Sequence, residues 1–322
     1  MPNKIALRAW TLLLLLTPFV QPVKSLGMKS TATVALPCES PQQLISPAGD
    51  QVALRCKDHS VRLVNVSSGA TQHTFGTELR INQYNYSRDG RWFAVGLWDG
   101  TVEVVPTSGT AEPKRWQSDS RRIETLEFFP DSSGIVVGPL DRPGQIWDLR
   151  GSPKQVATLH SDFGGLGACA FSPDGKLLLT ADGDTVVRFY DAATWKMLRE
   201  YRGLTLETFA VAFTTDGKRA VIGGPDEHIT VLDSATGAEL QKLPKDADMV
   251  QQLFPFGSDG EAVILYTDGD GKRPPHQSIW NANTAKSVPL TAERPLTGGG
   301  IVKGKLWVCS PRGKVLDIWV YE

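Results

Sequence analysis

The residue types that most often carry out catalysis or bind metal ions are few in this chain and widely separated. The five histidines are spread along the sequence, and none belongs to the HExxH pair that binds zinc. The chain also has no CxxC pair and no GxSxG sequence of the kind that presents a nucleophilic serine. We therefore expect no catalytic residue, no metal site and no cofactor.

Two glycine-containing segments resemble ligand-binding loops. Residues 299–305 fit the phosphate-loop pattern GxxxxGK, but the next residues (Leu306-Trp-Val) are typical of a strand, whereas a phosphate loop must lead into a helix. Residues 266–272 contain two aspartates, as the start of a calcium loop does, without the later ligands. We interpret the first segment as an inner strand with its hairpin, and the second as a plain hairpin.

A repeated turn indicates the architecture that must position the side chains. Six segments place a polar turn and a glycine after an apolar residue, as in Phe171-Ser-Pro-Asp-Gly175, and a weaker seventh ends at Gly304. The turn glycines lie 41 to 44 residues apart, at Gly49, Gly90, Gly134, Gly175, Gly217, Gly260 and Gly304. A period this regular is typical of a repeat protein.

Each repeat is expected to form four short antiparallel strands. Asp-Gly turns supply the positive φ angles of tight hairpins. Residues 185–191 alternate β-branched and aromatic side chains, with Arg188 at a position expected to face outward. A large apolar residue follows the turn aspartate by six positions, as Tyr190 follows Asp184. One such sheet cannot bury both of its faces, so the sheets should stack radially into a ring.

These features resemble the WD40 repeat. The resemblance is carried by Phe171-Ser-Pro-Asp-Gly175, by Tyr190-Asp191 and by the Trp147-Asp148 dipeptide, and it covers roughly residues 30–322. It implies a β-propeller. The Gly-His pair of WD40 repeats is mostly missing, so the hydrogen-bond relay that the family implies is expected only in part, through His160, Thr180, Asp184 and Tyr190.

The strand count predicts how the ring closes. The last repeat supplies three strands, whereas residues 31–36 precede the first complete repeat and have no place in it. We therefore expect an all-β, seven-bladed β-propeller of four-stranded antiparallel blades, closed by this N-terminal strand in the last blade.

The closure bears on the four cysteines. Cys38 would follow the closing strand and lie near Cys56 at the end of a strand of the first blade, so a Cys38–Cys56 disulfide is expected. Cys309, in the corresponding strand of the last blade, is a rival partner for Cys38. Cys169 falls in an inner strand, where we expect a small buried side chain.

The first 27 residues have the pattern of a signal peptide. Lys4 and Arg8 precede the apolar run from Trp10 to Val20, and small residues near Ser25 and Gly27 suit signal peptidase. The run is shorter than the roughly 20 residues of a membrane span. We expect a cleaved signal peptide (1–27), a single propeller domain (28–322) and a secreted or periplasmic protein, with a retained anchor as the alternative.

The expected function follows from the ring and from the charge. With 34 basic and 35 acidic residues, the chain has no global basic surface for nucleic acid. On such a ring the loops share one rim, and its candidate partner-binding residues are Trp98, Asp99, Arg121, Arg122, Asp141, Arg142, His160, Phe163, Glu227 and His228.

We expect a monomeric, non-enzymatic scaffold that mediates protein–protein interaction in the periplasm or the extracellular space, with no membrane span after the signal is removed. Trp98 is the strongest candidate on the rim, because aromatic residues and arginine are the usual binding hot spots. Two alternatives stay open. One is a propeller enzyme of the lactonase-like or quinoprotein-like kind, with its site in the axial channel, and the other is a binder of glycans or small ligands.

Overall fold

The structure, a computed structural model, describes residues 28–40, 42–76, 80–109, 111–226, 228–244, 250–257, 262–267, 276–281, 284, 286–290, 296 and 298–321. Every helix or strand assigned in these ranges is a β-strand, and none of the ranges contains a helix long and apolar enough to cross a membrane. The expected signal peptide (1–27) and residues 268–272 of the calcium-like hairpin lie outside the described residues.

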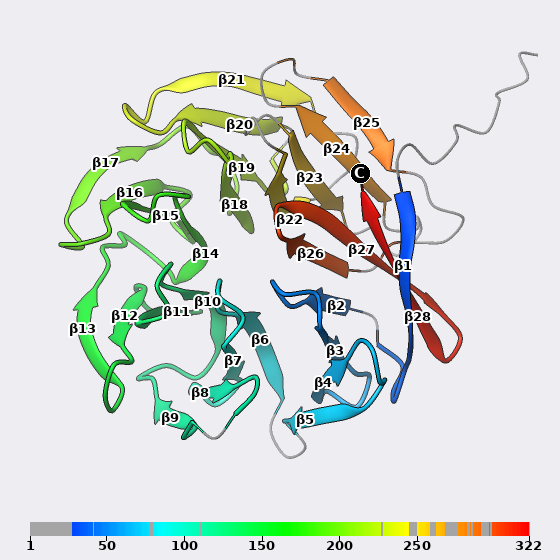
Figure 1. The fold of residues 1–322 in the computed structure, drawn as a ribbon. Coiled ribbons are helices and arrows are strands. Elements are labelled where there is room, and N and C mark those ends of the chain that lie inside the picture. Colours follow the sequence, from blue (N-terminus) through cyan, green and yellow to red (C-terminus); the bar gives the residue numbers. More distant parts are fainter. Residues whose placement is uncertain are drawn as a thin grey trace, which may run out of the picture.

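The strands form seven four-stranded blades around a central axis (Figure 1), as the repeat predicted. Blades one and two contain β2 (Gln42–Ile45), β3 (Gln51–Arg55), β4 (Val61–Asn65), β5 (Thr71–Phe75), and β6 (Ile81–Tyr86), β7 (Trp92–Leu97), β8 (Thr101–Pro106), β9 (Lys114–Gln117). Blades three and four contain β10 (Ile123–Phe128), β11 (Gly134–Pro139), β12 (Gln145–Asp148), β13 (Lys154–Thr158), and β14 (Leu166–Phe171), β15 (Leu177–Asp182), β16 (Val187–Asp191), β17 (Met197–Tyr201).

Blades five to seven complete the ring. Blades five and six contain β18 (Ala210–Phe213), β19 (Arg219–Gly223), β20 (His228–Asp233), β21 (Glu239–Pro244), and β22 (Val250–Phe256), β23 (Ala262–Thr267), β24 (His276–Asn281), β25 (Lys286–Leu290). Blade seven contains β26 (Gly298–Val302), β27 (Lys305–Arg312), β28 (Val315–Tyr321) and, as its outer strand, β1 (Met28–Ala35). The first strand of each blade lies nearest the axis (Figure 1).

The core lies between neighbouring blades, because each sheet must bury both faces. One cluster joins blades one and two and contains the fully buried residues Leu63, Ile81 and Phe93. The next cluster lies between blades two and three and contains Ala94 and Ile135. The middle strands are therefore buried on both faces, whereas the outer strands are largely exposed to solvent.

The ring is closed by the N-terminal strand, as expected. β1 pairs antiparallel with β28 from Met28 opposite Tyr321 to Ala35 opposite Val315, so it begins three residues earlier than residue 31 (Figure 1). A second junction joins the inner strands of blades one and seven, where Gln43 and Leu44 of β2 pair in parallel with Gly298 and Gly299 of β26. The glycine-rich segment is thus an inner strand at the crowded axis, and not a phosphate loop.

The parallel junction predicts the effect of one substitution. A Cβ atom at Gly298 would lie 2.1 Å from the carbonyl oxygen of Gln43, which is backbone and cannot swing aside. We expect Gly298→Ala to lower the free energy of unfolding by about 1–3 kcal/mol through overpacking. Gly151→Ala is the control, because nothing lies within 4 Å of its added Cβ. Equal stability of the two variants in urea denaturation would contradict this account of the junction.

Most of the predicted turn glycines adopt the expected conformation, but Gly134 does not. Gly49, Gly90, Gly175, Gly217 and Gly304 have φ between 70° and 78°. In blade three the turn has the same length as in blade four, but Ser132 occupies the position of Gly175 and takes the positive φ (62°), while Gly134 begins β11. Glycine is needed there for space, since a Cβ would lie 2.3 Å from the Phe129 ring. Gly260 lies outside the described residues.

A disulfide joins Cys38 to Cys56, with the Cα atoms 5.7 Å apart. It ties the segment after the closing strand to the end of β3 in blade one. The rival partner Cys309 is a fully buried free thiol in β27. Cys169 is also free and lies on the inner strand β14, as expected, but its side chain is only partly buried because it lines the axial cavity.

Candidate interaction rim and axial cavity

The loops that carry most of the predicted residues share one face of the ring. In blades two, three and four, the turn after the second strand is hydrogen-bonded to the segment that leads into the first strand. In blade two, the amide of Trp98 donates to the carbonyl oxygen of Arg80 at 3.0 Å. The equivalent bonds run from Leu140 to Arg122 in blade three and from Gly183 to Gly165 in blade four, both at 2.9 Å. We call this face the rim, and its described loops are residues 80, 98–100, 118–122, 140–144, 159–165, 183–185, 202–209 and 224–226.

Trp98 is the centre of the best-defined feature on the rim. Its ring lies between two guanidinium groups, with the ζ carbons of Arg80 and Arg122 at 4.7 and 4.6 Å from the ring centroid. Both contacts are cation–π interactions, and Arg122 also forms an ion pair with Glu124. The indole keeps 38% of its surface exposed. The stack therefore presents a rigid aromatic edge flanked by positive charge.

Arg80 was not among the residues predicted from the sequence. It precedes the inner strand β6 as Arg122 precedes β10, and the two arginines are 42 residues apart, which is one repeat period. Counting one repeat period back from Arg122 could therefore have identified Arg80 from the sequence.

The two predicted aspartates next to these arginines have structural roles in the loops. Asp99 accepts a hydrogen bond from the backbone nitrogen of Thr101 at 2.9 Å. Asp141 accepts one from the hydroxyl of Ser120. The side chains of Arg121 and Arg142 are exposed and have no carboxylate partner within the described part of the chain. The rim at blades two and three therefore offers charges of both signs to a partner, because a hydrogen-bonded aspartate keeps its negative charge.

The remaining predicted residues that the structure describes lie further round the rim, away from the Trp98 stack. Phe163 is 77% exposed at the tip of the loop between blades three and four. Its neighbour His160 pairs with Asp162 through Nε2 at 3.0 Å. His228 is exposed at the start of β20, and Glu227 lies outside the described residues.

Three exposed apolar residues on the rim were missed. Leu140, Leu206 and Phe209 are 49%, 48% and 44% exposed. The signal in the sequence is a large apolar side chain within a loop, where burial is difficult, and the same reasoning had been applied only to Trp98 and Phe163. With those two residues they make a discontinuous apolar set over blades two to five, the composition expected of a protein-binding surface.

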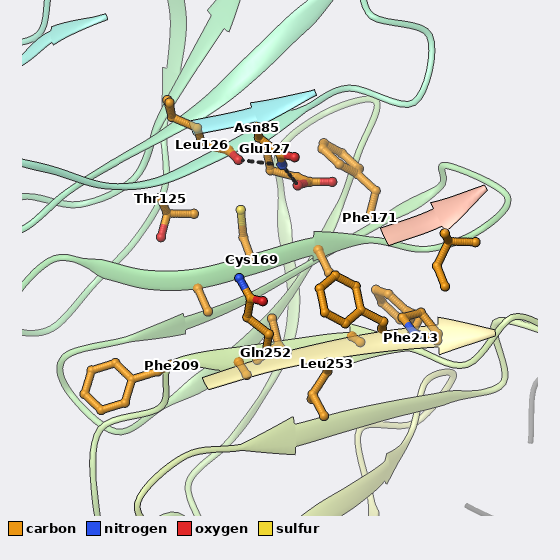
Figure 2. Close-up of a pocket in the computed structure, with 18 of the residues that line it drawn as sticks. Asn85, Thr125, Leu126, Glu127, Cys169, Phe171, Phe209, Phe213, Gln252 and Leu253 are labelled. Atoms are coloured by element: carbon orange, nitrogen blue, oxygen red, sulfur yellow. Dashed lines mark hydrogen bonds between the residues drawn. The ribbon is translucent and has the colours of Figure 1, made fainter. Parts of the chain in front are cut away.

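A second feature is a cavity of about 580 Å³ on the axis of the ring. Figure 2 shows residues of the inner strands lining it, among them Glu127, Cys169 and Gln252. Asn85 and Glu127 occupy equivalent positions, each next to the last residue of its inner strand, and Ala170 takes this place in blade four. The cavity has polar side chains at blades two, three, four and six, and apolar ones, among them Val211 and Leu253, at blades five and six.

Glu127 is the one carboxyl group among the described residues that line this cavity. Its Oε2 accepts a hydrogen bond from the Asn85 amide at 2.9 Å, and that amide also donates to the Leu126 carbonyl at 3.0 Å (Figure 2). Burial raises the pKa of Glu127 from 4.5 to about 7, although the charge of Arg88 and the Asn85 hydrogen bond lower it. Burial likewise holds the Cys169 thiol neutral by raising its pKa.

The raised pKa predicts a pH dependence of stability. The folded chain binds the Glu127 proton more tightly than the unfolded chain, so stability should rise as pH falls through about 7 and level off near 4.5. We expect Glu127→Gln to remove this contribution and to be at least as stable as the wild type at pH 8. Urea denaturation of both proteins between pH 8 and pH 5 measures it. Parallel pH profiles would contradict the assignment.

Comparisons with known proteins agree with this geometry. Residues 152–191 match the family model described as WD domain, G-beta repeat, a segment that runs from β13 through β16. A solved structure, the crystal structure of a mitotic checkpoint complex, contains a chain that superposes with a TM-score of 0.75 over 100% of this chain and 98% of that one, at 17% sequence identity. The protein is a WD40-repeat β-propeller.

Curated proteins similar to this WD40 propeller are longer than it is. SEC12-like protein 1 of Arabidopsis thaliana is 28% identical over 70% of this chain and 60% of its own length. The periodic tryptophan protein 2 homolog of Caenorhabditis elegans is 30% identical over 70% of this chain and 26% of its own length. The similar region thus spans between about a quarter and three fifths of these relatives.

The propeller does not contain the partial relay expected of its best WD40 repeat, in blade four. The Tyr190 hydroxyl donates to the carbonyl oxygen of His160 at 3.0 Å, while the imidazole pairs with Asp162 instead. Thr180 has no side-chain hydrogen bond, and Asp184 is bound by Arg188. Arg188 therefore provides the polar contacts that the relay would otherwise make.

Arg188 is fully buried in the WD40 propeller, so the expectation of an outward position was wrong. It lies on β16, a middle strand that is covered on both faces by the adjoining blades. Its guanidinium pairs with Asp182 at 2.7 Å and with Asp184 at 2.6 Å. Burial raises the pKa of Asp182 to about 7, against the opposing effect of Arg188. For Asp184, burial also opposes ionisation, but the hydrogen bond from Arg188 lowers the pKa.

Proposed function

We propose that this WD40 propeller is a non-enzymatic, monomeric scaffold that binds a protein partner on the rim, and that it acts in the periplasm or outside the cell. The Arg80–Trp98–Arg122 stack carries the proposal. Tryptophan and arginine are the residues most enriched at binding hot spots, and a stacked indole loses little side-chain entropy on binding.

The rim supports a partner segment with apolar and acidic side chains. Leu140, Phe163 and Phe209 offer apolar contacts, and Arg121 and Arg142 are exposed cations. A carboxylate that approaches Trp98 would meet two guanidinium groups already held in place, which favours charge-assisted hydrogen bonds.

Site-specific photo-crosslinking tests the partner proposal. A photoreactive phenylalanine analogue at Phe163, on the rim, is compared with one at Val156, which is 48% exposed on the outer strand β13. We expect a discrete cross-linked protein from the Phe163 position only, and its loss when Trp98→Ala is added. Equal cross-linking from Val156, or an unchanged yield in the Trp98→Ala protein, would contradict the proposal.

The Cys38–Cys56 disulfide supports the proposal of export, since disulfides persist in oxidising compartments. The N-terminal pattern of a signal peptide points the same way. Mass spectrometry of the protein from its native source should give a mature N-terminus after Ser25 or Gly27, in the exported fraction. A reduced protein that keeps Met1 and stays in the cytosolic fraction would overturn export and leave the rim proposal to its own test.

A further inference from the structure

We propose that the axial cavity is a binding site for a small amine carried on an apolar body, with Glu127 as the group that binds the cation. This site meets the rim surface only at Phe209, so it goes beyond the scaffold function. It rests on three observations: the volume of the cavity, the polar and apolar side chains that line it, and the surroundings of Glu127.

The volume and walls of the cavity suit an amphipathic small molecule. About 580 Å³ lies within the range of small-molecule sites. Blades two to four line it with the amide of Asn85, the carboxyl of Glu127 and the thiol of Cys169, while blades five and six add Val211, Leu253 and the amide of Gln252. A ligand with one polar end and an apolar body would find contacts for both parts among these side chains.

Aromatic rings also line the cavity, at blades four and five. Phe171, Phe209 and Phe213 line it and are visible around its polar centre in Figure 2. The faces of such rings carry negative potential and attract an ammonium group, whereas they give no such attraction to a carboxylate.

The charges that face Glu127 favour a cation at this carboxyl. One oxygen, Oε2, accepts from Asn85, which leaves Oε1 as an acceptor for the ligand. Arg88 is the cation whose charge reaches Glu127, but its side chain is exposed at the end of the cavity, where its Nη1 donates to the Pro173 carbonyl at 3.3 Å. The Cys169 thiol beside Glu127 is neutral.

The ionisation of Glu127 should make the affinity for the ligand depend on pH. The pKa of this carboxyl is about 7 in the free protein, and an ammonium ion binds its ionised form. Affinity for an amine should therefore rise as pH increases from 6 to 8, while the amine itself stays protonated.

Titration with three probes of similar size tests the proposal. The probes are 2-phenylethylamine, 2-phenylethanol and 3-phenylpropionate, followed by NMR with the purified protein. We expect saturable binding of the amine and weaker binding of the other two. Glu127→Gln should lower the affinity for the amine by about tenfold or more, the effect of a lost hydrogen bond to a charged group. Glu124→Gln is the matched control, since it changes a carboxyl on the same strand that pairs with Arg122.

Three results would overturn the proposal: no saturation by the amine, equal affinity for all three probes, or equal affinity for the amine in the wild type and Glu127→Gln. Because Glu127→Gln keeps the size and an acceptor for Asn85, it should fold. Trp98→Ala should leave binding of the amine unchanged, so failure of the rim proposal and failure of this one are distinguishable.

Discussion

Replacement of Arg188 by methionine should lower the free energy of unfolding by about 3–5 kcal/mol, the cost of breaking a buried ion pair from one side. Asp182 is 3% exposed, and without the guanidinium 2.7 Å away its carboxylate would be buried with no counter-ion. Asp184 would lose its partner too. Urea denaturation at pH 8, above the pKa of about 7 that Asp182 has in the wild type, measures the loss.

Two further variants separate the ion pair from general damage. The double variant Arg188→Met with Asp182→Asn should regain a large part of the lost stability, because it removes the unpaired charge. Arg142→Met changes an exposed arginine on the rim and should alter stability by no more than about 0.5 kcal/mol. If Arg188→Met is as stable as Arg142→Met, the buried ion pair of Arg188 does not stabilise the protein as described.

Loss of the Cys38–Cys56 disulfide should cost about 3 kcal/mol of stability, as the chain-entropy relation gives for a closed loop of this length. The two cysteines are 18 residues apart, and the bridge fixes the segment that follows the closing strand against blade one. The variant Cys38→Ser with Cys56→Ser, compared with the oxidised wild type in urea denaturation, measures the cost.

Reductant supplies the control for this comparison. Dithiothreitol should destabilise the wild type by a similar amount and leave the double serine variant unchanged, since the other cysteines, Cys169 and Cys309, are free thiols. Equal midpoints for the oxidised and reduced wild type would show that the ring closes through β1 and β28 without help from the bridge.

The fold could be predicted because its signals repeat. A turn that recurs about every 42 residues needs no single strong motif, and counting strands located the closing strand to within three residues. The error at Gly134 arose because a serine, Ser132, occupies the turn position that glycine fills in most of the other blades. The error at Arg188 had a different cause. Alternation predicts an outward position only where one face of a sheet meets solvent, and β16 is covered on both faces.

The candidate site was predicted less completely, because it depends on contacts between repeats. Trp98 and Arg122 were identified from residue type and loop position, but the stack with Arg80 requires knowledge of which loops touch. Asp99 and Asp141 were predicted as binding residues, although turn hydrogen bonds use their carboxylates. The axial cavity was recognised only as a place for an alternative function, since Glu127 gives no signal until the inner strands converge.

The affinity of the purified partner for rim variants tests the central claim most directly. Once cross-linking has identified that partner, calorimetry compares Trp98→Ala with Leu240→Ala, a change to an exposed apolar residue on the outer strand β21. The account predicts a loss of about 2 kcal/mol or more for Trp98→Ala, which is roughly thirtyfold in Kd, and none for Leu240→Ala. Unchanged affinity in the Trp98→Ala protein would contradict the assignment of the rim as the binding surface.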